Sequence, residues 1–382
     1  MDLGFSKDQK MIQTSVREFL EMECPSDRVR ELEEDGKGYD PEMWQMMAEL
    51  GWMGIIFPEE YGGTEGDFID LMLVIEEMGR KLLPSPFFST VALCSLPLLQ
   101  YGNSEQKERF LPRIAAGEQI WTLALTESSA SYRPSDIKLN AALEGEEYLL
   151  SGTKVFVPYA HVADHLLVLA RDEDGFTMFI VDTKTQGIKA EVIPTTAHDK
   201  QYEVTFDDVR VPVRNIIAEA GRGWDIVNFI LQRGTLLKCA EMLGGAQAAS
   251  EITNDYAKKR IQFDRPIASF QAIQHKLTDM FIDVEGLRYL IYEAAWGISR
   301  GSPSDLLISM AKAKANEVYQ RTCIEGIKVH GAIGFTREQD IGLYHLRTKA
   351  WEFALGDSNF HRERIATELE HYQPPTSWSS DT

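Results

Sequence analysis

Basic side chains cluster at the end of a predicted helix, within the segment Tyr256–Met280. Lys258, Lys259 and Arg260 occupy its last turn, where cations are favoured by the negative end of the helix dipole. Pro266 is expected to end this helix, because proline lacks a backbone N–H and restricts the residue before it. A second helix pattern follows, so the spacing alone predicts a helical hairpin within a bundle, with cations at its turn.

Other residue types that often carry catalysis show no productive spacing. His161, His275, His330 and His361 are not spaced as metal ligands, and no HExxH motif or carboxylate cluster accompanies them. We therefore expect no metal site, and neither a Ser/His/Asp triad nor a P-loop can be argued. The four cysteines lie far apart without a CxxC pair, which is typical of thiols in a reducing cytosol; they are Cys24, Cys94, Cys239 and Cys323.

Composition narrows the class of protein. The 382 residues carry a net charge of −20, with 44% hydrophobic and 26% charged residues, which is ordinary for a soluble globular protein. An acidic surface disfavours nucleic acid or an anionic membrane as the main partner. No apolar run reaches the ~18 residues of a membrane span, and the chain opens without a signal-peptide pattern. These features predict a soluble, cytoplasmic protein.

The elements that must position these residues follow a helix–strand–helix order. Residues 5–120 are helical in pattern, with Ser6 as a candidate N-cap. The pattern turns helical again near Ile216 and continues to about Glu370. Between these regions, short β-like runs at this spacing predict a sandwich or barrel rather than parallel β–α units. The runs are Trp121–Leu125, Ala141–Leu143, Tyr148–Ser151, Lys154–Val157, His165–Ala170, Thr177–Val181, Lys189–Ile193 and Glu203–Val209.

We expect three domains of an α+β protein. An N-terminal helical domain covers residues 1–120, a β-domain covers 121–220, and a C-terminal helical bundle covers 221–382. The helices Pro41–Leu50 and Phe68–Leu83 belong to the first domain. Breaks in the last domain are expected at Gly301–Pro303 and His330–Phe335, and the tail Tyr372–Thr382 is expected to fray.

Four segments in register resemble motifs of the FAD-dependent acyl-CoA dehydrogenase family. Tyr256–Met280 contains a run similar to R-x-Q-F-G-x-P-(I/L)-x-x-F-Q-A, and Leu123–Ser128 is similar to LTEP. Gly152–Ala160 is similar to G-x-K-x-(W/F)-I-(T/S)-N, and Lys328–Phe335 to Q-x-(H/L)-G-G-x-G-(F/Y). The resemblance covers nearly the whole chain. It implies an acyl-CoA dehydrogenase-like fold, with a middle β-barrel or sandwich, a C-terminal four-helix bundle, and FAD between these two domains.

The resemblance also implies the residues that bind FAD. Phe156 would pack on the flavin ring, and Arg260 would pair with the pyrophosphate of a flavin held mainly by another subunit. Two positions depart from the family: Ser131 replaces a glycine, and Pro158 replaces a Thr or Ser hydroxyl. The full implied set is Leu125, Thr126, Ser131, Phe156, Pro158, Arg260, Phe263, Gln271, Lys328, Gly331, Asp357 and Asn359.

The catalytic base of the family is absent from both of its usual positions. Oxidation at the α and β carbons of a thioester needs a carboxylate that removes the α proton. In most members the base is the Glu of a Y-E-G-T motif, which aligns with Leu355 here. In other members the Glu lies on the long helix of the C-terminal domain, at the position that aligns with Gly234. Asp357 is the candidate substitute, with Glu241 less favoured. Asp357 is equally well interpreted as a loop carboxylate or a flavin-ribose contact.

Three hypotheses therefore stay open. Another acid such as Asp357 serves as base, a related second subunit supplies it, or the chain is a degenerate homologue with a structural or binding role. Leu355–Arg364 resembles the LFGD-x-x-x-H-R-E-R branch of the family, which includes partners in heteromeric dehydrogenases.

The substrate and the partners are also implied by the resemblance. Tyr132, Gln232 and Thr235 are the expected substrate contacts, and Tyr132 and Thr235 depart from the family's residues. The departures favour a bulky, alicyclic or dicarboxylic acyl-CoA. The expected electron acceptor is an electron-transfer flavoprotein, with oxidase chemistry as a further option. The chain is expected to form a homo-oligomer or a heteromer with a related subunit.

Overall fold

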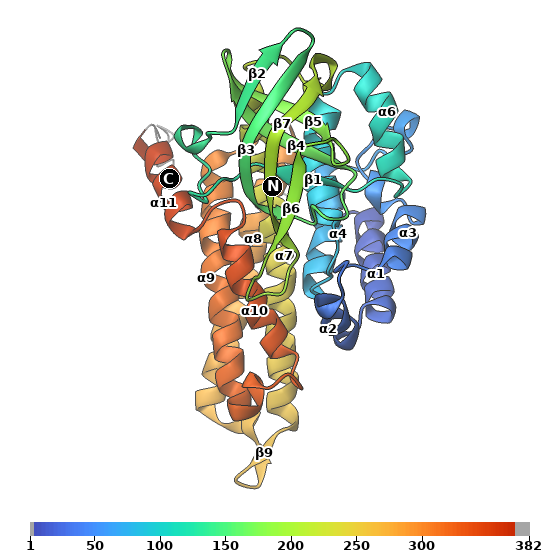
Figure 1. The fold of residues 1–382 in the computed structure, drawn as a ribbon. Coiled ribbons are helices and arrows are strands. Elements are labelled where there is room, and N and C mark those ends of the chain that lie inside the picture. Colours follow the sequence, from blue (N-terminus) through green and yellow to red (C-terminus); the bar gives the residue numbers. More distant parts are fainter. Residues whose placement is uncertain (1–3, 371–382) are drawn as a thin grey trace, which may run out of the picture.

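The computed structural model describes residues 4–370, so the predicted fraying of the tail lies outside the described residues. Three regions follow one another along the chain. Figure 1 shows the strands at one end of a set of long helices, with the N-terminal helices along one side. This is the predicted helical, sheet and helical order.

The N-terminal region is built from short amphipathic helices. Ser6 caps the first helix as predicted, because its hydroxyl accepts from the Gln9 N–H while the Gln9 side chain accepts from the Ser6 N–H. A π-helical segment, η3 (Phe88–Ser95), interrupts the series. Such segments are rare and often occur at functional sites. The α-helices are α1 (Lys7–Glu23), α2 (Ser26–Glu34), α3 (Pro41–Glu49), α4 (Phe68–Arg80), α5 (Leu96–Tyr101) and α6 (Ser104–Ala115).

The middle region is one eight-stranded sheet in the order β6-β7-β3-β2-β4-β5-β8, with β1 parallel to β4. Two predicted runs, Tyr148–Ser151 and Lys154–Val157, are wrong as separate strands because they form the single strand β3. Gly152 adopts φ 145° where the register with β7 shifts, so the strand continues through a bulge. The strands are β1 (Trp121–Ala124), β2 (Asn140–Glu144), β3 (Glu147–Pro158), β4 (His165–Asp172), β5 (Gly175–Asp182), β6 (Ile188–Ile193), β7 (Gln201–Pro212) and β8 (Ile216–Ile217).

Side chains of β4 alternate between two cores. Leu166 and Val168 share a core with residues of β3 and β7, so the curved sheet packs upon itself. Leu167 and Leu169 face the opposite way and pack in a second core with helical residues such as Ile226. Both faces of the strand are buried, and the second core attaches the sheet to the long helices.

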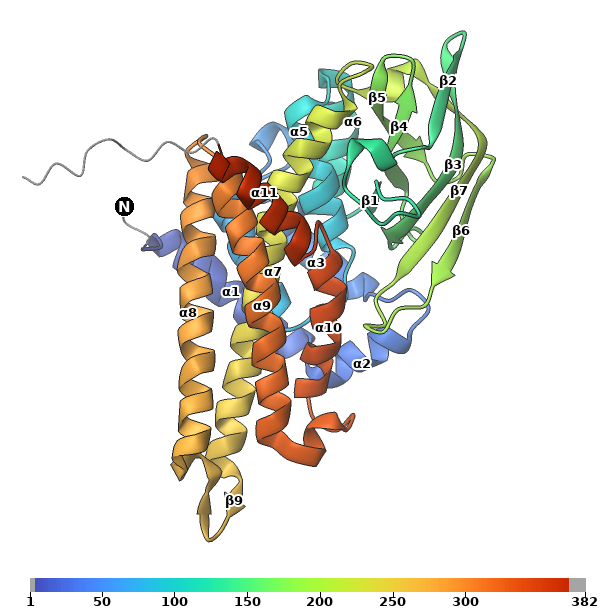
Figure 2. The same cartoon turned by 90° about the vertical axis from the view of Figure 1, so that its left-hand side faces the viewer.

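The C-terminal region is helical: α7 (Gly223–Lys259), α8 (Gln271–Ser299), α9 (Asp305–His330), α10 (Ile341–Phe353) and α11 (Ser358–Glu370). Figure 2 shows α8, α7 and α9 running side by side, with α10 and α11 against α9. No helix among residues 4–370 combines the length and apolarity needed to cross a membrane.

The expectation that Pro266 ends α7 is wrong. The helix ends at Lys259, and a short hairpin of β9 (Ile261–Gln262) and β10 (Arg265–Pro266) leads to α8. Phe263 and Asp264 have φ values of 54° and 63°, as a two-residue hairpin turn of this kind requires. Proline is tolerated there because the ribbon has only two strands and both are edges.

Candidate functional site

A cavity of about 1030 Å³ lies between one side of the sheet domain and the helices. Its walls come from the loop after β1, from β3, from η3 and α7, and from the segment that joins α10 to α11. Nine residues named from the sequence meet around it: Leu125, Thr126, Ser131, Tyr132, Phe156, Pro158, Leu355, Asp357 and Asn359. The tertiary structure thus brings together segments that are more than 200 residues apart.

On the sheet side, Phe156 is the residue best placed to pack against a planar group. Its ring is 48% exposed although it lies on β3, and its φ of 54° turns it out of the regular strand. Thr126 offers no free hydroxyl proton, because its Oγ1 donates to the Val155 carbonyl at 2.7 Å. Pro158 supplies no N–H, but its carbonyl accepts from Thr122. An exposed aromatic ring beside a cavity of this size fits a flavin.

A buried ion pair holds this side of the cavity together. Lys154 Nζ lies 2.8 Å from Glu127 Oε1 and 3.1 Å from the Leu125 carbonyl. The Glu127 carboxylate also accepts from the Lys138 and Leu139 N–H groups. Burial lowers the pKa of Lys154 to about 8, against the opposing effect of Glu127. Both residues belong to motifs quoted from the sequence, yet their pairing was not predicted.

On the helical side, the Leu355 peptide is held from both directions. Its N–H donates to Tyr132 Oη at 2.9 Å, and its carbonyl lies 3.0 Å from His361 Nε2. Leu355 adopts φ 60°, which is unusual for a residue with a side chain. The Tyr132 hydroxyl therefore uses its acceptor side, and its proton has no partner among residues 4–370. Burial raises the pKa of Tyr132 to about 12, so the hydroxyl stays protonated.

The two positions where the family carries its base face each other. A Cβ atom on Gly234 would lie 3.3 Å from Leu355 Cδ1 and 2.8 Å from Leu93 Cδ2. Leu355 and Leu93 are both buried. The structure therefore places an apolar contact where either carboxylate would stand, and a side chain at position 234 would require the Leu93 side chain to move.

Asp357 lines the cavity and immediately precedes α11. Its Oδ1 accepts from the Phe360 N–H at 2.8 Å, as an N-cap does. Its other carboxylate oxygen has no hydrogen-bond partner within the described chain. Glu241, the less favoured acid, instead forms an ion pair with Lys238, which lines the same cavity.

Two expected substrate contacts do not line this cavity. The Gln232 amide donates to Asp305 at 2.9 Å and its carbonyl accepts from Arg233, so it is engaged within the helical region. Thr235 is 1% exposed, and its hydroxyl has no partner in the described part of the chain. The sequence pointed to α7, but the residue of that helix that reaches the cavity is Lys238.

The residues expected to reach a second subunit lie on the outside of this chain. Phe263 is 86% exposed at the tip of the hairpin, which Figure 1 shows at the end of the bundle opposite the sheet. A separate cavity of about 290 Å³ lies beside Gly334 and Phe335 in the segment after α9. Arg260, Phe263, Gln271, Lys328 and Gly331 are all exposed and are not part of the large cavity.

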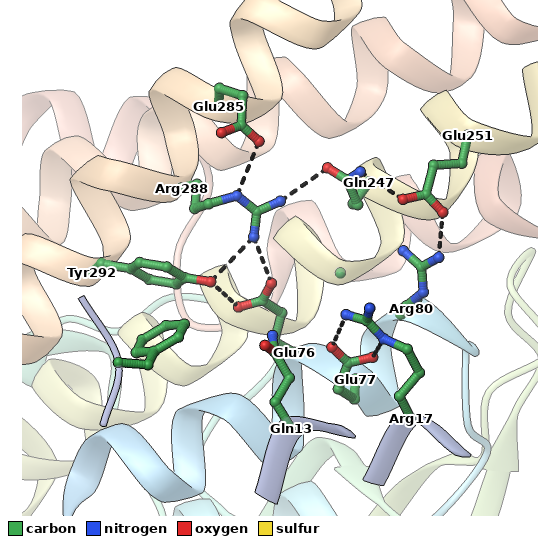
Figure 3. A pocket seen from close by; sticks show the side chains of 12 residues that line it. Gln13, Arg17, Glu76, Glu77, Arg80, Gln247, Glu251, Glu285, Arg288 and Tyr292 are labelled. Atoms are coloured by element: carbon green, nitrogen blue, oxygen red, sulfur yellow. Dashed lines mark hydrogen bonds and ion pairs between the residues drawn. The ribbon is translucent and has the colours of Figure 1, made fainter. Parts of the chain in front are cut away.

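A further pocket of about 340 Å³ lies between the N-terminal helices and α7 and α8. Figure 3 shows its charged side chains turned toward one another. The ion pairs are Arg17–Glu77, Arg80–Glu251, Arg288–Glu76 and Arg288–Glu285. Since each charge has a partner, this pocket joins helices rather than offering a ligand site. Among residues 4–370, no group of three or more His, Cys, Asp or Glu side chains could hold a metal ion.

Comparison with known proteins covers all three regions. The protein-family models of the acyl-CoA dehydrogenase N-terminal, middle and C-terminal domains match residues 6–118, 122–209 and 221–370, respectively. A probable acyl-CoA dehydrogenase of Bacillus subtilis, YngJ, is 32% identical over 97% of this chain and 100% of its own length.

Two solved structures resemble the whole chain. A chain in a structure described as the electron transferring flavoprotein of Acidaminococcus fermentans has a TM-score of 0.91 and 30% identity, covering 97% of this chain and 99% of that one. A chain of the ChsE4–ChsE5 complex of Mycobacterium tuberculosis has a TM-score of 0.90 and 28% identity, covering 98% and 100%.

Proposed function

The chain belongs to the acyl-CoA dehydrogenase family, and on that premise we propose that it takes part in the α,β-dehydrogenation of an acyl-CoA thioester. The observation that supports this proposal is the cavity between sheet and helices, which gathers seven of the twelve expected flavin residues and, of the expected substrate contacts, Tyr132. FAD is the cofactor of the family, and when bound it supplies a hydride acceptor for the β carbon.

The chain's own residues would orient the cofactor and substrate. Phe156 offers a ring for the flavin to pack on, and the ion pair of Glu127 and Lys154 keeps the loop after β1 in register with β3. The Tyr132 hydroxyl, oriented by the Leu355 N–H, has a proton to donate. Donated to the thioester carbonyl, it would stabilise the negative charge that forms when the α proton leaves.

The catalytic base could belong to this chain or to a related partner subunit. In the first form Asp357 removes the α proton, supported by its place on the cavity and its unpaired oxygen. In the alternative, this chain is a non-catalytic flavin-binding partner in a heteromeric dehydrogenase, supported by the apolar contact of Gly234, Leu355 and Leu93. A partner subunit would then carry out proton removal at its own site.

The electron acceptor and the assembly are part of the proposal. We infer an electron-transfer flavoprotein as acceptor and a homo-oligomer or heteromer as the assembly. The likeness to chains in an electron transferring flavoprotein structure and in the ChsE4–ChsE5 complex supports these inferences. Exposed Arg260 and Phe263 also fit a flavin shared between subunits. A cytoplasmic location is supported by four buried free thiols.

The test is anaerobic addition of acyl-CoA thioesters to the purified chain, followed at the flavin absorption band. Bleaching identifies a complete dehydrogenase. A retained flavin that no thioester bleaches, but that bleaches after co-expression with a Glu-bearing homologue, identifies a partner subunit. Absence of flavin, together with no retention of added FAD, would contradict both forms. Peroxide formed in air would indicate an oxidase instead.

Asp357→Asn separates the base from the helix cap. Asparagine is as good an N-cap as aspartate, so this variant is expected to keep the stability of α11 while losing the carboxylate. If Asp357 is the base, flavin reduction falls at least ~100-fold. An unchanged reduction rate would leave Asp357 with its capping role alone. Asp357→Ala is the control for the cap, with an expected loss of about 1 kcal/mol of unfolding free energy.

A further inference from the structure

We propose that Lys238 is a specificity-determining residue that binds an oxygen acceptor at the far end of the acyl group. The inference rests on the proposed function and narrows its substrate class. The substrate would be a short acyl thioester that ends in a carboxylate or another oxygen acceptor, rather than in a plain hydrocarbon.

Lys238 is a charged side chain in a wall where an apolar one would be expected. It projects from α7 and is 7% exposed, yet it lines the large cavity. It also lines a smaller, adjoining cavity of about 120 Å³ together with Glu241 and Trp351. The Lys238 side chain therefore lies where the two cavities adjoin.

The ammonium group has donors to spare. A lysine carries three N–H bonds, and among residues 4–370 the one hydrogen bond that Lys238 Nζ makes is to Glu241 Oε2. The Nζ atom also lies 3.8 Å from the centre of the Phe88 ring and 5.4 Å from that of Trp351. Ring faces attract a cation but do not replace oxygen acceptors. Since buried donors are nearly always satisfied, the site is completed by an acceptor that enters the cavity.

The position of Lys238 along α7 indicates which part of a bound acyl chain its ammonium group can contact. Lys238 follows Gly234 by four residues, so both lie on one face of the helix, about 6 Å apart along its axis. Gly234 faces Leu355 at the family's base position, which marks where the α carbon of a substrate would lie. Because the lysine side chain extends roughly another 6 Å from the backbone, the acceptor is expected a few carbons beyond the α carbon, near the end of a short acyl chain.

Other charged groups near Lys238 are already paired or committed. Arg347 of α10 pairs with Glu33 of α2. Lys312 of α9 donates to Asn316 and to the Trp351 and Glu352 carbonyls at the end of α10. Among residues 4–370, Lys238 is therefore the buried ammonium on the cavity wall that has free donors, whereas Lys349 on the same wall is half exposed and pairs with Glu352. Glu241 holds Lys238 in place through one bond, at a separation of one helical turn.

Among residues 4–370, Asp199 is the acid that lines both cavities, and its negative charge would oppose a carboxylate ligand. Asp357 lines the large cavity at the segment between α10 and α11. The Asp199 carboxylate accepts from the Thr195 hydroxyl and from the Gln201 amide. These bonds hold it on the sheet side of the cavity, whereas Lys238 lies on the helical side. A ligand oxygen that contacts Lys238 is therefore drawn to the helical wall.

The test compares thioesters of equal chain length that differ at the far end. Binding of hexanoyl-CoA and adipyl-CoA, and of butyryl-CoA, succinyl-CoA and 4-hydroxybutyryl-CoA, is measured on the flavin-loaded protein by calorimetry. Binding does not require turnover, so the result is independent of the base. The wild type is expected to bind adipyl-CoA at least ~10-fold more tightly than hexanoyl-CoA. The neutral hydroxyl of 4-hydroxybutyryl-CoA shows whether Lys238 requires only an oxygen acceptor or a negatively charged group.

Lys238→Met, which keeps an unbranched apolar stem, is expected to abolish this preference, and Lys238→Arg to retain it. Lys349→Met is the matched control, because Lys349 lines the same cavity but is half exposed and pairs with Glu352; it should leave the preference intact. Equal loss of all thioesters in Lys238→Met, or a wild-type preference for hexanoyl-CoA, would overturn the inference. Failure of every thioester to bind would overturn the proposed function itself.

Discussion

At the scale of single residues, Tyr132 shows how a substitution can change a site without emptying it. From the sequence it is a bulky replacement in a loop. In the structure its hydroxyl accepts the N–H of Leu355 and its ring lies 6.0 Å from that of Phe360. One side chain thus bridges the sheet domain and the segment that usually carries the base.

We predict that Tyr132→Phe slows flavin reduction by substrate about 10- to 100-fold, while flavin retention stays unchanged. The reason is that the ring packing survives, whereas the hydroxyl that orients and donates is lost. Anaerobic stopped-flow absorption measures the rate. Tyr289→Phe, at an exposed position on α8, is the control and should leave it unaltered. A Tyr132→Phe rate equal to that of the wild type would show that the hydroxyl serves packing only.

At the scale of elements, the segment between α10 and α11 depends on a buried histidine. His361 is 2% exposed, its Nε2 contacts the Leu355 carbonyl, and its Nδ1 has no partner within residues 4–370. Burial lowers the pKa of His361 to about 4. The folded state therefore binds fewer protons than the unfolded state between about pH 6.5 and 4.

The contribution of the neutral His361 to the free energy of unfolding is fully present above pH 6.5. It is lost as the pH falls through about 4, by about 3 kcal/mol in total. We predict that His361→Gln loses less unfolding free energy than the wild type between pH 7 and pH 4. Urea denaturation at each pH measures this, and the exposed His275→Gln variant should follow the wild type. Parallel curves for His361→Gln and the wild type would contradict the prediction.

A second prediction at this scale concerns the charged pocket of Figure 3. Arg288 of α8 contacts Glu76, Gln247, Glu285 and Tyr292, which tie α8 to α4 and α7. Arg288→Met leaves the buried Glu76 without its cation, and we expect a loss of about 3 kcal/mol of unfolding free energy. Chemical denaturation tests this against Arg300→Met, an exposed change at the end of the same helix. Equal stability of the two variants would show that the network contributes little.

At the scale of the whole molecule, the residues expected to bind FAD lie in two separate groups. The hairpin after α7 is remote from the large cavity, and Arg260 and Phe263 are exposed there. An exposed aromatic ring, together with a guanidinium that has no ion-pair partner within residues 4–370, on a protein of net charge −20 would suit an anionic group bound between subunits.

We predict that Arg260→Ala weakens FAD retention at least ~10-fold without changing the fold of the monomer. Equilibrium dialysis of FAD, together with circular dichroism, measures the two effects. Lys259→Ala, one residue earlier and also exposed, is the matched control. Unchanged retention in Arg260→Ala would mean that the flavin is bound within a single chain.

Much of this architecture could be predicted because it depends on interactions between residues that are close together in the sequence. Ser6 with Gln9, the apolar spacing of the long helices and the glycine- and proline-bounded strands each act through neighbours in sequence. The merged strand β3 and the hairpin after Lys259 were missed. The sequence pattern predicts a break at Gly152 and at Pro266. In the structure a β-bulge accommodates the glycine within β3, and an edge strand accommodates the proline.

By itself the sequence determined the family, the order of helices and strands, and the loss of an acid at positions 234 and 355. Motif spacing and residue identity carry that information along the chain. Only the tertiary structure decided which groups face the cavity: it assigned Asp357 to a helix cap and Tyr132 to the Leu355 peptide, and it turned Lys238 inward. Direction and burial depend on how distant segments pack, and no local pattern specifies which lysine on a helix face will meet solvent or a cavity.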